Sequence, residues 1–265
     1  MSKRVIVNGA LGRMGQEVVK TVTTETEDII VGVCDRENIG QDIMDLLSLE
    51  GEEVIINNNL EETIKNTNPD VVIDFTTPSV VMENINIGLS NGINMIVGTT
   101  GITDVDLKLI KKLTEENNVN ALIVPNFAVG AILMMRFAQE AAKYMDDVEI
   151  IELHHDQKVD SPSGTAIKTA ELIKENRRKN CKKQLEEIEK IPGARGADAD
   201  GIKIHSVRLP GLVAHQEVIF GAEGQSLLLK HDSYNRKSFM PGVRLALDNI
   251  LKIDGLVYGL ENILN

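Results

Sequence analysis

A glycine-rich turn close to the start of the chain limits the possible folds more than any other feature. Glycines at a GxxGxxG spacing, from Gly9 to Gly15, follow a short apolar run over residues 4–8 that has strand character. A helical pattern runs on to about Thr24, and a second apolar run over 29–34 ends at Asp35. This order of strand, glycine turn, helix and strand predicts a β-α-β unit.

The glycine turn is typical of a site for the pyrophosphate of a dinucleotide. Glycine allows the tight turn and lets the backbone approach the ligand. The helix that begins near Arg13 offers free N–H groups and a favourable dipole at the same place. A tight turn between strand and helix, with no ligand, is the alternative when the glycines are read alone.

Asp35 lies at the end of the second predicted strand, twenty residues beyond Gly15. A carboxylate there can accept hydrogen bonds from the ribose of an adenosine, which favours a dinucleotide site. An ordinary loop carboxylate is the alternative. Asp35 favours the free 2′-hydroxyl of NADH, whereas Arg36 and Arg13 can neutralise the 2′-phosphate of NADPH. We therefore expect either cofactor to bind, with a preference for NADH.

Strand and helix patterns alternate up to residue 124, which predicts a doubly wound α/β domain of the Rossmann type with a parallel sheet. The strand patterns cover 71–75, 95–97 and 121–124, and the helical patterns cover 79–90 and 103–117. Near-continuous apolar strands like these belong to sheets that are covered on both faces. The loop Gly98-Thr99-Thr100-Gly101 follows one of them, at the sheet edge where a nicotinamide lies, although alone it is read as a turn.

After Asn126 the pattern changes to that of a second, α+β domain. Helices are predicted over 130–145 and 163–176, and strands over 148–153, 202–209, 215–221 and 225–231. We expect these strands to form an open antiparallel sheet. Residues 175–190 predict a charged, solvated helix, and residues 192–201 predict a mobile loop. A last helix over 241–251 is expected to return to the first domain.

Composition makes several classes of protein poor candidates. The formal net charge of -12, the 3% of aromatic residues and the lack of Trp disfavour a nucleic-acid binder, because such proteins use clustered cations and stacking rings. Cys34 and Cys181 form no CxxC pair, which argues against a disulfide framework and a cysteine-based zinc site. Residues 1–4 lead directly into a strand, and no apolar run has membrane length, so we expect neither signal peptide nor membrane span, and a cytoplasmic location.

The segment from Glu149 to Ala166 is the most informative part of the sequence. A predicted strand ends in His154 and His155, Lys158 follows, and Ser163-Gly164-Thr165 opens a helix. The helix start can hold a carboxylate through its N–H groups and the Thr165 hydroxyl, and Lys158 supplies a positive charge. A histidine that titrates near neutrality can deliver a proton. The segment therefore predicts a site for an anionic substrate.

Single residues of this segment also fit simpler structural roles. Ser163 alone is an ordinary N-cap, and Gly164 alone is an ordinary turn residue. The histidine pair beside Asp156 resembles a metal site, but adjacent residues on an extended chain point to opposite sides, so we expect no metal. The isolated histidines are expected on the surface or in the core: His205, His215 and His231.

Taken together, these motifs resemble the 4-hydroxy-tetrahydrodipicolinate reductase family, formerly called dihydrodipicolinate reductase. The resemblance covers nearly the whole chain, and its clearest motif runs from Glu152 to Ala166. It also includes the glycine turn with Arg13 and Met14, the Gly98–Gly101 loop and Pro125-Asn126-Phe127. The implied protein is an NAD(P)H-dependent oxidoreductase of the diaminopimelate route to lysine, and its substrate is a small dicarboxylate imine.

The resemblance implies a homotetramer of two-domain subunits. The dinucleotide-binding domain would cover 1–126 together with 236–265, and the substrate-binding and tetramerisation domain would cover 127–235. The implied catalytic residues are His154 and Lys158, and the implied substrate-binding residues are His155, Ser163, Gly164 and Thr165. The implied cofactor contacts are Gly9, Ala10, Leu11, Gly12, Arg13, Met14, Asp35, Arg36, Gly98, Thr99, Thr100, Pro125, Asn126, Phe127 and Ala128.

One position departs from the family pattern, because Asp35 stands where relatives often carry Glu. The shorter side chain leaves the choice between NADH and NADPH open. Two other functional classes also fit the first domain. One is a Rossmann reductase of an amino-acid-derived imine, similar to aspartate dehydrogenase, and the other is a non-catalytic dinucleotide sensor. The histidine segment favours the reductase of a dicarboxylate, since a sensor needs no proton donor beside an anion site.

Overall fold

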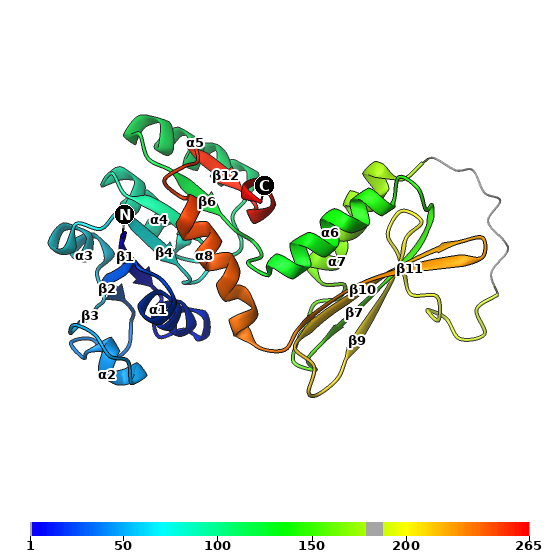
Figure 1. Ribbon diagram of the computed structural model, residues 1–265, viewed down its shortest axis with the longest axis horizontal. Helices are drawn as coiled ribbons and strands as arrows, with labels where there is room; N and C mark the ends of the chain where they lie inside the picture. Colours follow the sequence, from blue (N-terminus) through cyan, green and yellow to red (C-terminus); the bar gives the residue numbers. More distant parts are fainter. Residues whose placement is uncertain (1, 179–187, 265) are drawn as a thin grey trace. The chain divides into compact units, whose positions relative to one another are not determined.

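The computed structural model describes residues 2–178 and 188–264, and the chain divides into two units. Unit 1 contains Met1–Phe127 and Phe239–Asn265, and unit 2 contains Ala128–Ser238 (Figure 1). Cys181 and most of the predicted charged helix over 175–190 lie outside the described residues. Among the described residues, no helix is long and apolar enough to span a membrane.

Unit 1 is built on a seven-stranded parallel sheet with the strand order β12-β6-β5-β4-β1-β2-β3. Its strands are β1 (Arg4–Asn8), β2 (Ile29–Cys34), β3 (Ile56–Asn57), β4 (Val71–Asp74), β5 (Asn94–Val97), β6 (Ala121–Ile123) and β12 (Leu256–Tyr258). Its helices are α1 (Arg13–Glu25), α2 (Ile43–Leu47), α3 (Leu60–Thr67), α4 (Val81–Ser90), α5 (Asp104–Asn117), α8 (Met240–Asn249) and η2 (Leu260–Ile263), while η1 (Arg236–Phe239) leads into α8. The order reverses between β1 and β4, which makes the doubly wound arrangement that the alternating pattern predicts.

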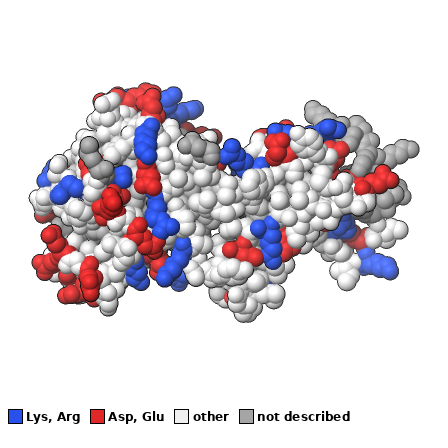
Figure 2. Space-filling view, in the orientation of Figure 1, with Lys and Arg blue, Asp and Glu red and all other residues white. Residues whose placement is uncertain are grey.

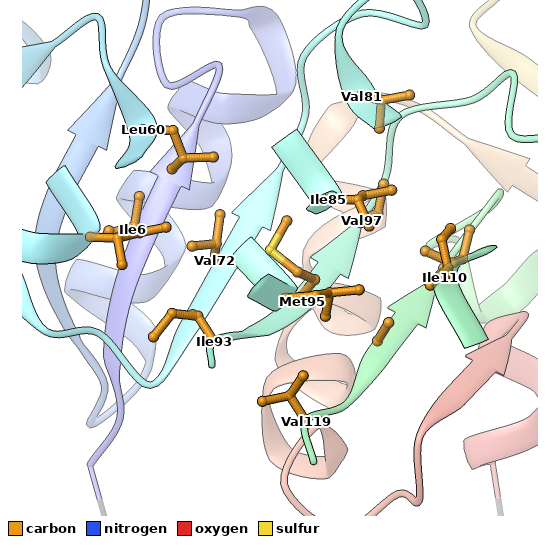
Figure 3. Close-up of a cluster of buried hydrophobic side chains, with 14 of the residues drawn as sticks. Ile6, Leu60, Val72, Val81, Ile85, Ile93, Met95, Val97, Ile110 and Val119 are labelled. Carbon is orange, nitrogen blue, oxygen red and sulfur yellow. The ribbon is translucent and has the colours of Figure 1, made fainter. Parts of the chain in front are cut away.

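Helices cover the sheet of unit 1 on both sides, which explains why its strands are apolar along their whole length. In Figure 1, α1 and α8 lie together on one side, and α3, α4 and α5 follow one another on the other. The strand residues Ile6, Val72 and Val97 point into one cluster with Ile85 of α4 and Ile110 of α5 (Figure 3). All five side chains are buried. This core holds the strands in place, and it therefore fixes the positions of the loops that follow the strand ends.

The surface of unit 1 agrees with the acidic composition. On the face shown in Figure 2, acidic side chains gather at the end of the unit that carries α2. Exposed carboxylates of this region are Asp45, Glu50, Glu52 and Glu53. A surface of this charge repels phosphate backbones.

Unit 2 is a five-stranded mixed sheet with the order β11-β10-β7-β9-β8. Its strands are β7 (Asp147–His154), β8 (Ala197–Asp198), β9 (Lys203–Arg208), β10 (Ala214–Ala222) and β11 (Gln225–Ser233), and its helices are α6 (Val129–Ala141) and α7 (Gly164–Asn176). Both helices pack on one face of the sheet, around a core that includes Ile150, Ile173, Val218 and Phe220.

The structure corrects the prediction that all strands of the second domain are antiparallel. β10 pairs antiparallel with β7 and with β11, but β9 pairs parallel with β7. After β7 the chain forms α7 and re-enters the sheet from the end where β7 began, which requires parallel pairing. Alternation of apolar and polar residues shows that a strand has two faces, but it carries no information on direction.

The segment between α7 and β9 also differs from its prediction. α7 ends at Asn176, and Arg177 has extended backbone, so the described flanks of 175–190 do not continue a helix. The predicted loop over 192–201 contains the short strand β8, which pairs with β9. Arg195 in this loop binds the carboxylate of Glu149 on β7, at 2.5 and 3.3 Å. The described part of the loop is therefore tied to the sheet.

Candidate functional sites in the two units

The glycine turn of unit 1 needs glycine at two of its three positions. Gly9 has φ +79°, and a Cβ there would lie 2.6 Å from the carbonyl oxygen of Phe75. A Cβ on Gly15 would overlap the carbonyl oxygen of Gly9. These contacts let α1 start directly against the ends of β1 and β4, as the sequence predicts for a nucleotide-binding turn.

The start of α1 suits an anionic ligand. Gly12 is the N-cap and has no side chain to cap the helix, and the first turn carries no acidic residue. The first N–H groups of a helix lack partners within the helix, and they attract negative charge. The turn therefore has the geometry and the electrostatics that a pyrophosphate requires.

Asp35 braces the glycine turn. Its Oδ2 accepts a hydrogen bond from the Leu11 N–H at 2.8 Å, and its Oδ1 accepts one from the Arg36 N–H at 2.7 Å. These contacts explain the position of Asp35 without a ligand, as expected if it is an ordinary loop carboxylate. The Glu37 N–H also donates to Oδ1, at 3.4 Å, so the second lone pair of Oδ2 is the acceptor that Asp35 keeps for a ribose hydroxyl.

A cavity of about 690 Å³ opens beside this turn. Its wall combines the ends of β1, β2 and β4 with the start of α3 and the exposed side of α4. Five of the predicted cofactor residues line it: Gly9, Leu11, Gly12, Asp35 and Arg36. The other lining residues are Asn8, Cys34, Glu37, Asn58, Asn59, Leu60, Glu61, Phe75, Thr76, Thr77, Val80, Glu83, Asn84 and Ile87. The size and mixed polarity suit a nucleotide.

Several predicted cofactor residues lie behind the cavity wall. A Cβ on Gly98 would overlap the ring of Phe75, whose centroid lies 5.3 Å from that of Phe127. Thr99 is buried and donates to Asp74 at 2.8 Å. Gly98, Thr99 and Phe127 therefore support the wall. The remaining predicted cofactor residues do not line this cavity: Ala10, Arg13, Met14, Thr100, Pro125, Asn126 and Ala128.

Asp74, at the end of β4, is a residue that the sequence analysis missed. Its side chain is fully buried, and it accepts hydrogen bonds from Asn8 and Asn84 at 2.9 Å each and from the Thr76 hydroxyl at 2.8 Å. Asn8, Thr76 and Asn84 all line the cavity, so one carboxylate fixes three polar groups of its wall. The only sequence signal is a charged residue at the end of an otherwise apolar strand.

In unit 2, β7 brings His154 to the start of α7. The imidazole Nδ1 lies 2.5 Å from Oε2 of Glu152, whose side chain is fully buried. His154 itself is 16% exposed, so one side of the ring reaches the surface. His155 is exposed and follows the end of the strand. His154 is the last residue of β7, and His155 is the first residue beyond it.

Burial lowers the pKa of His154, and the hydrogen bond from its ring to Glu152 only partly offsets this effect. Lys158 and Arg208 lower it further. Burial alone would raise the pKa of Glu152, but hydrogen bonds from Arg208, Ser206 and His154 together hold this pKa below its usual range. His154 is thus an imidazole whose pKa is lowered by burial, hydrogen-bonded to an ionised carboxylate, which suits a group that takes up and releases a proton.

Of the predicted carboxylate-binding residues, Ser163, Gly164 and Thr165 form the start of α7, and Lys158 lies in the loop before it. The Ser163 hydroxyl caps the helix by accepting a hydrogen bond from the Ala166 N–H at 3.2 Å. Gly164 is exposed, and a Cβ on it would meet nothing within 4 Å. The ammonium of Lys158 binds Asp160, at 2.7 and 2.8 Å from its two oxygens. Structure and sequence thus agree on an N-cap role for Ser163, while Gly164 stands open to a ligand.

The other histidines of unit 2 have partners of their own. His205 lies 2.8 Å from Glu149, and His215 lies 2.7 Å from Asp232. His231 packs against Gly130 at the start of α6. Within residues 2–178 and 188–264, no three or more His, Cys, Asp or Glu side chains form a group that could hold a metal ion.

Comparison with known proteins covers both units. Residues 3–127 match the model of dihydrodipicolinate reductase, N-terminus, and residues 130–264 match that of dihydrodipicolinate reductase, C-terminus. The chain is 50% identical to 4-hydroxy-tetrahydrodipicolinate reductase of Bacillus subtilis, over 99% of this chain and 98% of that protein. It is 52% identical to the enzyme of the same name from Listeria monocytogenes, over 99% of this chain and all of that protein.

A solved structure agrees with these matches. Dihydrodipicolinate reductase from Paenisporosarcina, in a dipicolinate-bound form, superposes with a TM-score of 0.89, at 49% identity and with full coverage of both chains. An amine dehydrogenase from Mycobacterium smegmatis, 14% identical, shares the fold with a TM-score of 0.69, over 98% of this chain and 96% of that one. From the two family models and the near-complete alignments at half identity, we conclude that this chain belongs to the dihydrodipicolinate reductase family.

Proposed function

We propose that this chain catalyses the NAD(P)H-dependent reduction of 4-hydroxy-tetrahydrodipicolinate to tetrahydrodipicolinate, a step of the diaminopimelate route to lysine. One observation carries the proposal beyond family membership. In unit 2 a partly exposed imidazole, His154, stands at the end of β7 with its Nδ1 on a buried carboxylate, close in sequence to a helix start and a lysine. A proton donor beside two positive centres suits a dianionic ring.

Unit 1 is proposed to hold the dinucleotide and unit 2 the substrate, with residues 1–126 and 236–265 forming the first domain and 127–235 the second. Gly9, Leu11 and Gly12 would receive the pyrophosphate at the start of α1, and Asp35 the adenosine ribose. The Gly98–Thr100 loop and the 125–128 segment would face the nicotinamide half. When bound, the reduced nicotinamide supplies the two electrons of the reduction.

The residues of unit 2 bind and protonate the substrate in this proposal. Gly164 and Thr165 offer N–H groups and a hydroxyl to one carboxylate, and Lys158 offers an ammonium to another. Asp160 holds that ammonium in the structure, so a substrate carboxylate must take its place. His154 donates the proton that completes the reduction, the 4-hydroxyl of the ring is lost as water, and His155 contacts the substrate.

The charges along the cavity of unit 1 favour NADH over NADPH. Carboxylates outnumber cations on its wall, where Asp35, Glu37, Glu61 and Glu83 stand against Arg36. A 2′-phosphate adds about two negative charges and is disfavoured among carboxylates. Arg36 keeps NADPH binding possible, so we infer that both cofactors serve and that NADH binds more tightly.

We expect the enzyme to be cytoplasmic. We also propose that the chain forms a homotetramer through unit 2. α6 and α7 pack on one face of the sheet, and on the opposite face apolar side chains lie among charged ones such as Glu149, Glu217 and Lys230. The apolar residues of this face are Ile151 and Leu153 on β7, Ile219 on β10 and Leu228 on β11, of which Leu228 is 53% exposed. Such a face suits burial against a second copy.

The reaction is tested by mixing the protein with NADH and the enzymatically generated cyclic imine, and by following absorbance of the reduced nicotinamide. His154→Gln is expected to lower kcat by about 10²–10⁴-fold, the usual contribution of a general acid, while the affinity for NADH stays the same. His205→Gln is the matched control, because His205 also pairs with a glutamate of β7.

Dipicolinate, which the Paenisporosarcina relative binds, serves as a stable probe of the substrate site. If a high concentration of the imine relieves the inhibition of NADH oxidation by dipicolinate, the imine and dipicolinate share one site. Absence of imine-dependent NADH oxidation in the folded protein would contradict the proposed reaction, and an unchanged rate in His154→Gln would remove His154 from it.

A further inference from the structure

The buried carboxylate of Glu152 gathers the polar groups at the end of β7. Besides His154, it accepts two hydrogen bonds from the guanidinium of Arg208, from Nη1 at 2.9 Å and from Nη2 at 2.8 Å. The backbone N–H of Ser163, the N-cap of α7, lies 3.3 Å from its Oε1, and the Ser206 hydroxyl also bonds to it. One carboxylate therefore connects the imidazole to the start of the proposed substrate-binding helix.

The register of the sheet explains how these groups meet. Glu152 lies opposite Ser206 on β9, and His154 lies opposite Arg208 on the same strand. Because side chains two residues apart share a face of a strand, all four point to one side of the sheet. Arg208 also donates to the backbone carbonyl of Asp160 at 2.8 Å, in the loop that carries Lys158. It thus holds the carboxylate and the loop together.

A buried ion pair of this kind is a poor means of stabilising a fold. Removing a carboxylate and a guanidinium from water costs several kcal/mol, and apolar side chains of similar volume are often as stable or more stable. Glu152 is fully buried and Arg208 is 19% exposed at its side chain. The arrangement is better explained by a requirement for one fixed geometry around His154.

We propose that Glu152, held in place by Arg208, is the positioning residue that sets the tautomer and the orientation of His154. An ionised carboxylate only accepts hydrogen bonds, so Nδ1 of His154 must carry a proton and donate it to Glu152. Nε2 is then the nitrogen that exchanges a proton with the substrate. Neither Glu152 nor Arg208 touches the substrate in this account. The inference rests on the proposed function only where it concerns the effect of Glu152 on the rate of imine reduction.

The charged groups near His154 determine the direction in which its pKa changes when Glu152 is neutralised. Glu152 on β7 favours the imidazolium, whereas Arg208 on β9 and Lys158 in the following loop oppose it. β10 places the uncharged Ala214 opposite His154, and the first turn of α7 carries no acidic residue. Neutralising Glu152 should therefore lower the pKa of His154 further.

The test begins with the protein labelled with ¹⁵N-histidine and without ligands, so that it is independent of activity. In the wild type, the neutral form of His154 is expected to carry its proton on Nδ1. In Glu152→Gln, the pKa of His154 is expected to fall, and the Nδ1-protonated form is expected to lose its dominance. An unchanged pKa and tautomer would overturn the proposal.

Glu149→Gln provides the matched control. Glu149 lies on the same strand and also binds an arginine and a histidine, Arg195 and His205, but it lies away from His154. This variant removes the contact between Glu149 and His205 and is expected to leave the titration of His154 unchanged. Equal shifts of His154 in both variants would show a general loosening of β7 and would contradict a specific positioning role.

Kinetics of the imine reduction complete the test. Glu152→Gln is expected to lower kcat by about 10-fold or more at neutral pH with little change in KM for NADH, since it impairs the proton donor alone. The alkaline limb of the pH profile is expected to move to lower pH, because less of the acid form remains. A uniform loss at all pH values would contradict the inference.

Arg208→Lys keeps the proposal testable if Glu152→Gln fails to fold. Lysine keeps a positive charge near Glu152 but lacks the planar fork with which Arg208 gives each oxygen its own N–H donor. The Nδ1-protonated tautomer is expected to persist, with a smaller loss of kcat than in Glu152→Gln. If the wild type shows the predicted tautomer but no imine reduction, the proposed function fails while the positioning of His154 stands.

Discussion

Two carboxylates, Asp35 and Glu152, show how the partners of a side chain decide its role. Asp35 accepts from backbone N–H groups of Leu11 and Arg36 and remains partly exposed on the cavity wall. Glu152 is fully buried and accepts from an arginine and a histidine. The first can still receive ligand hydroxyls, whereas the second has its lone pairs occupied and acts through its neighbours.

Asp35→Ala is expected to weaken NADH binding more than NADPH binding. Loss of a charge-assisted hydrogen bond to the ribose costs about 1.5–3 kcal/mol, which is on the order of 10-fold or more in Kd. The affinity for NADPH is expected to fall less, because Arg36 can still bind its 2′-phosphate. Titration of each cofactor by fluorescence gives the two Kd values, with Asp45→Ala, an exposed carboxylate of α2, as control. Equal losses for both cofactors would mean that Asp35 only braces the turn.

The sequence reveals some residues of the sites and hides others for a physical reason. Asp35, His154 and Gly164 lie within or next to recognisable local motifs, so their positions could be predicted. Arg208 is 56 residues away from Glu152, and only the register of β9 against β7 brings them together. Asp74 is hidden in the same way, because its partners come from β1, the β5 loop and α4.

At the scale of elements, the start of α7 combines a good cap with a residue that weakens the helix. Ser163 caps the first turn, yet Gly164 follows it, where packing does not require glycine. Glycine at a position that alanine could occupy without strain costs about 0.4–1 kcal/mol, because it leaves the unfolded chain more conformational freedom. Free space above the backbone is what a carboxylate needs to reach the N–H groups, so the lost stability is consistent with a ligand site.

Gly164→Ala is therefore expected to stabilise the protein while it weakens substrate binding. The free energy of unfolding should rise by up to about 1 kcal/mol. KM for the imine should rise by roughly 10-fold, equivalent to about 1.4 kcal/mol, because a methyl group occupies the approach to the helix start. Denaturant titration and initial rates measure the two effects, and Glu171→Ala on the same helix is the control. An unchanged KM would place the substrate carboxylate elsewhere.

Elements were predictable where a long periodic pattern repeats. The helices α1, α4 and α5 and the strands of the first β-α-β unit begin and end within about two residues of their predictions. The short elements 43–47, 56–57 and 60–67 were missed, because a few residues do not establish a period. β12 was missed for the same reason, and it exists only by pairing with β6.

At the scale of the whole molecule, the two units bury their cores in different ways. The sheet of unit 1 has helices on both sides, as its uniformly apolar strands require. The sheet of unit 2 carries both of its helices on one face, and its strands alternate accordingly, with β7 buried at every second residue from Val148 to Glu152. In the described part of the chain, its other face carries no helix, and we propose that a second copy of the chain covers it.

Leu228→Glu tests whether a second copy of the chain covers this face. Leu228 lies on the edge strand β11 opposite Ile219, so a carboxylate there would be buried unpaired in an interface, at a cost of several kcal/mol. Sedimentation is expected to give a tetramer for the wild type and smaller species for Leu228→Glu. Leu251→Glu is the matched control, since Leu251 is 52% exposed but belongs to unit 1. A monomeric wild type, or equal dissociation of both variants, would contradict assembly through the sheet of unit 2.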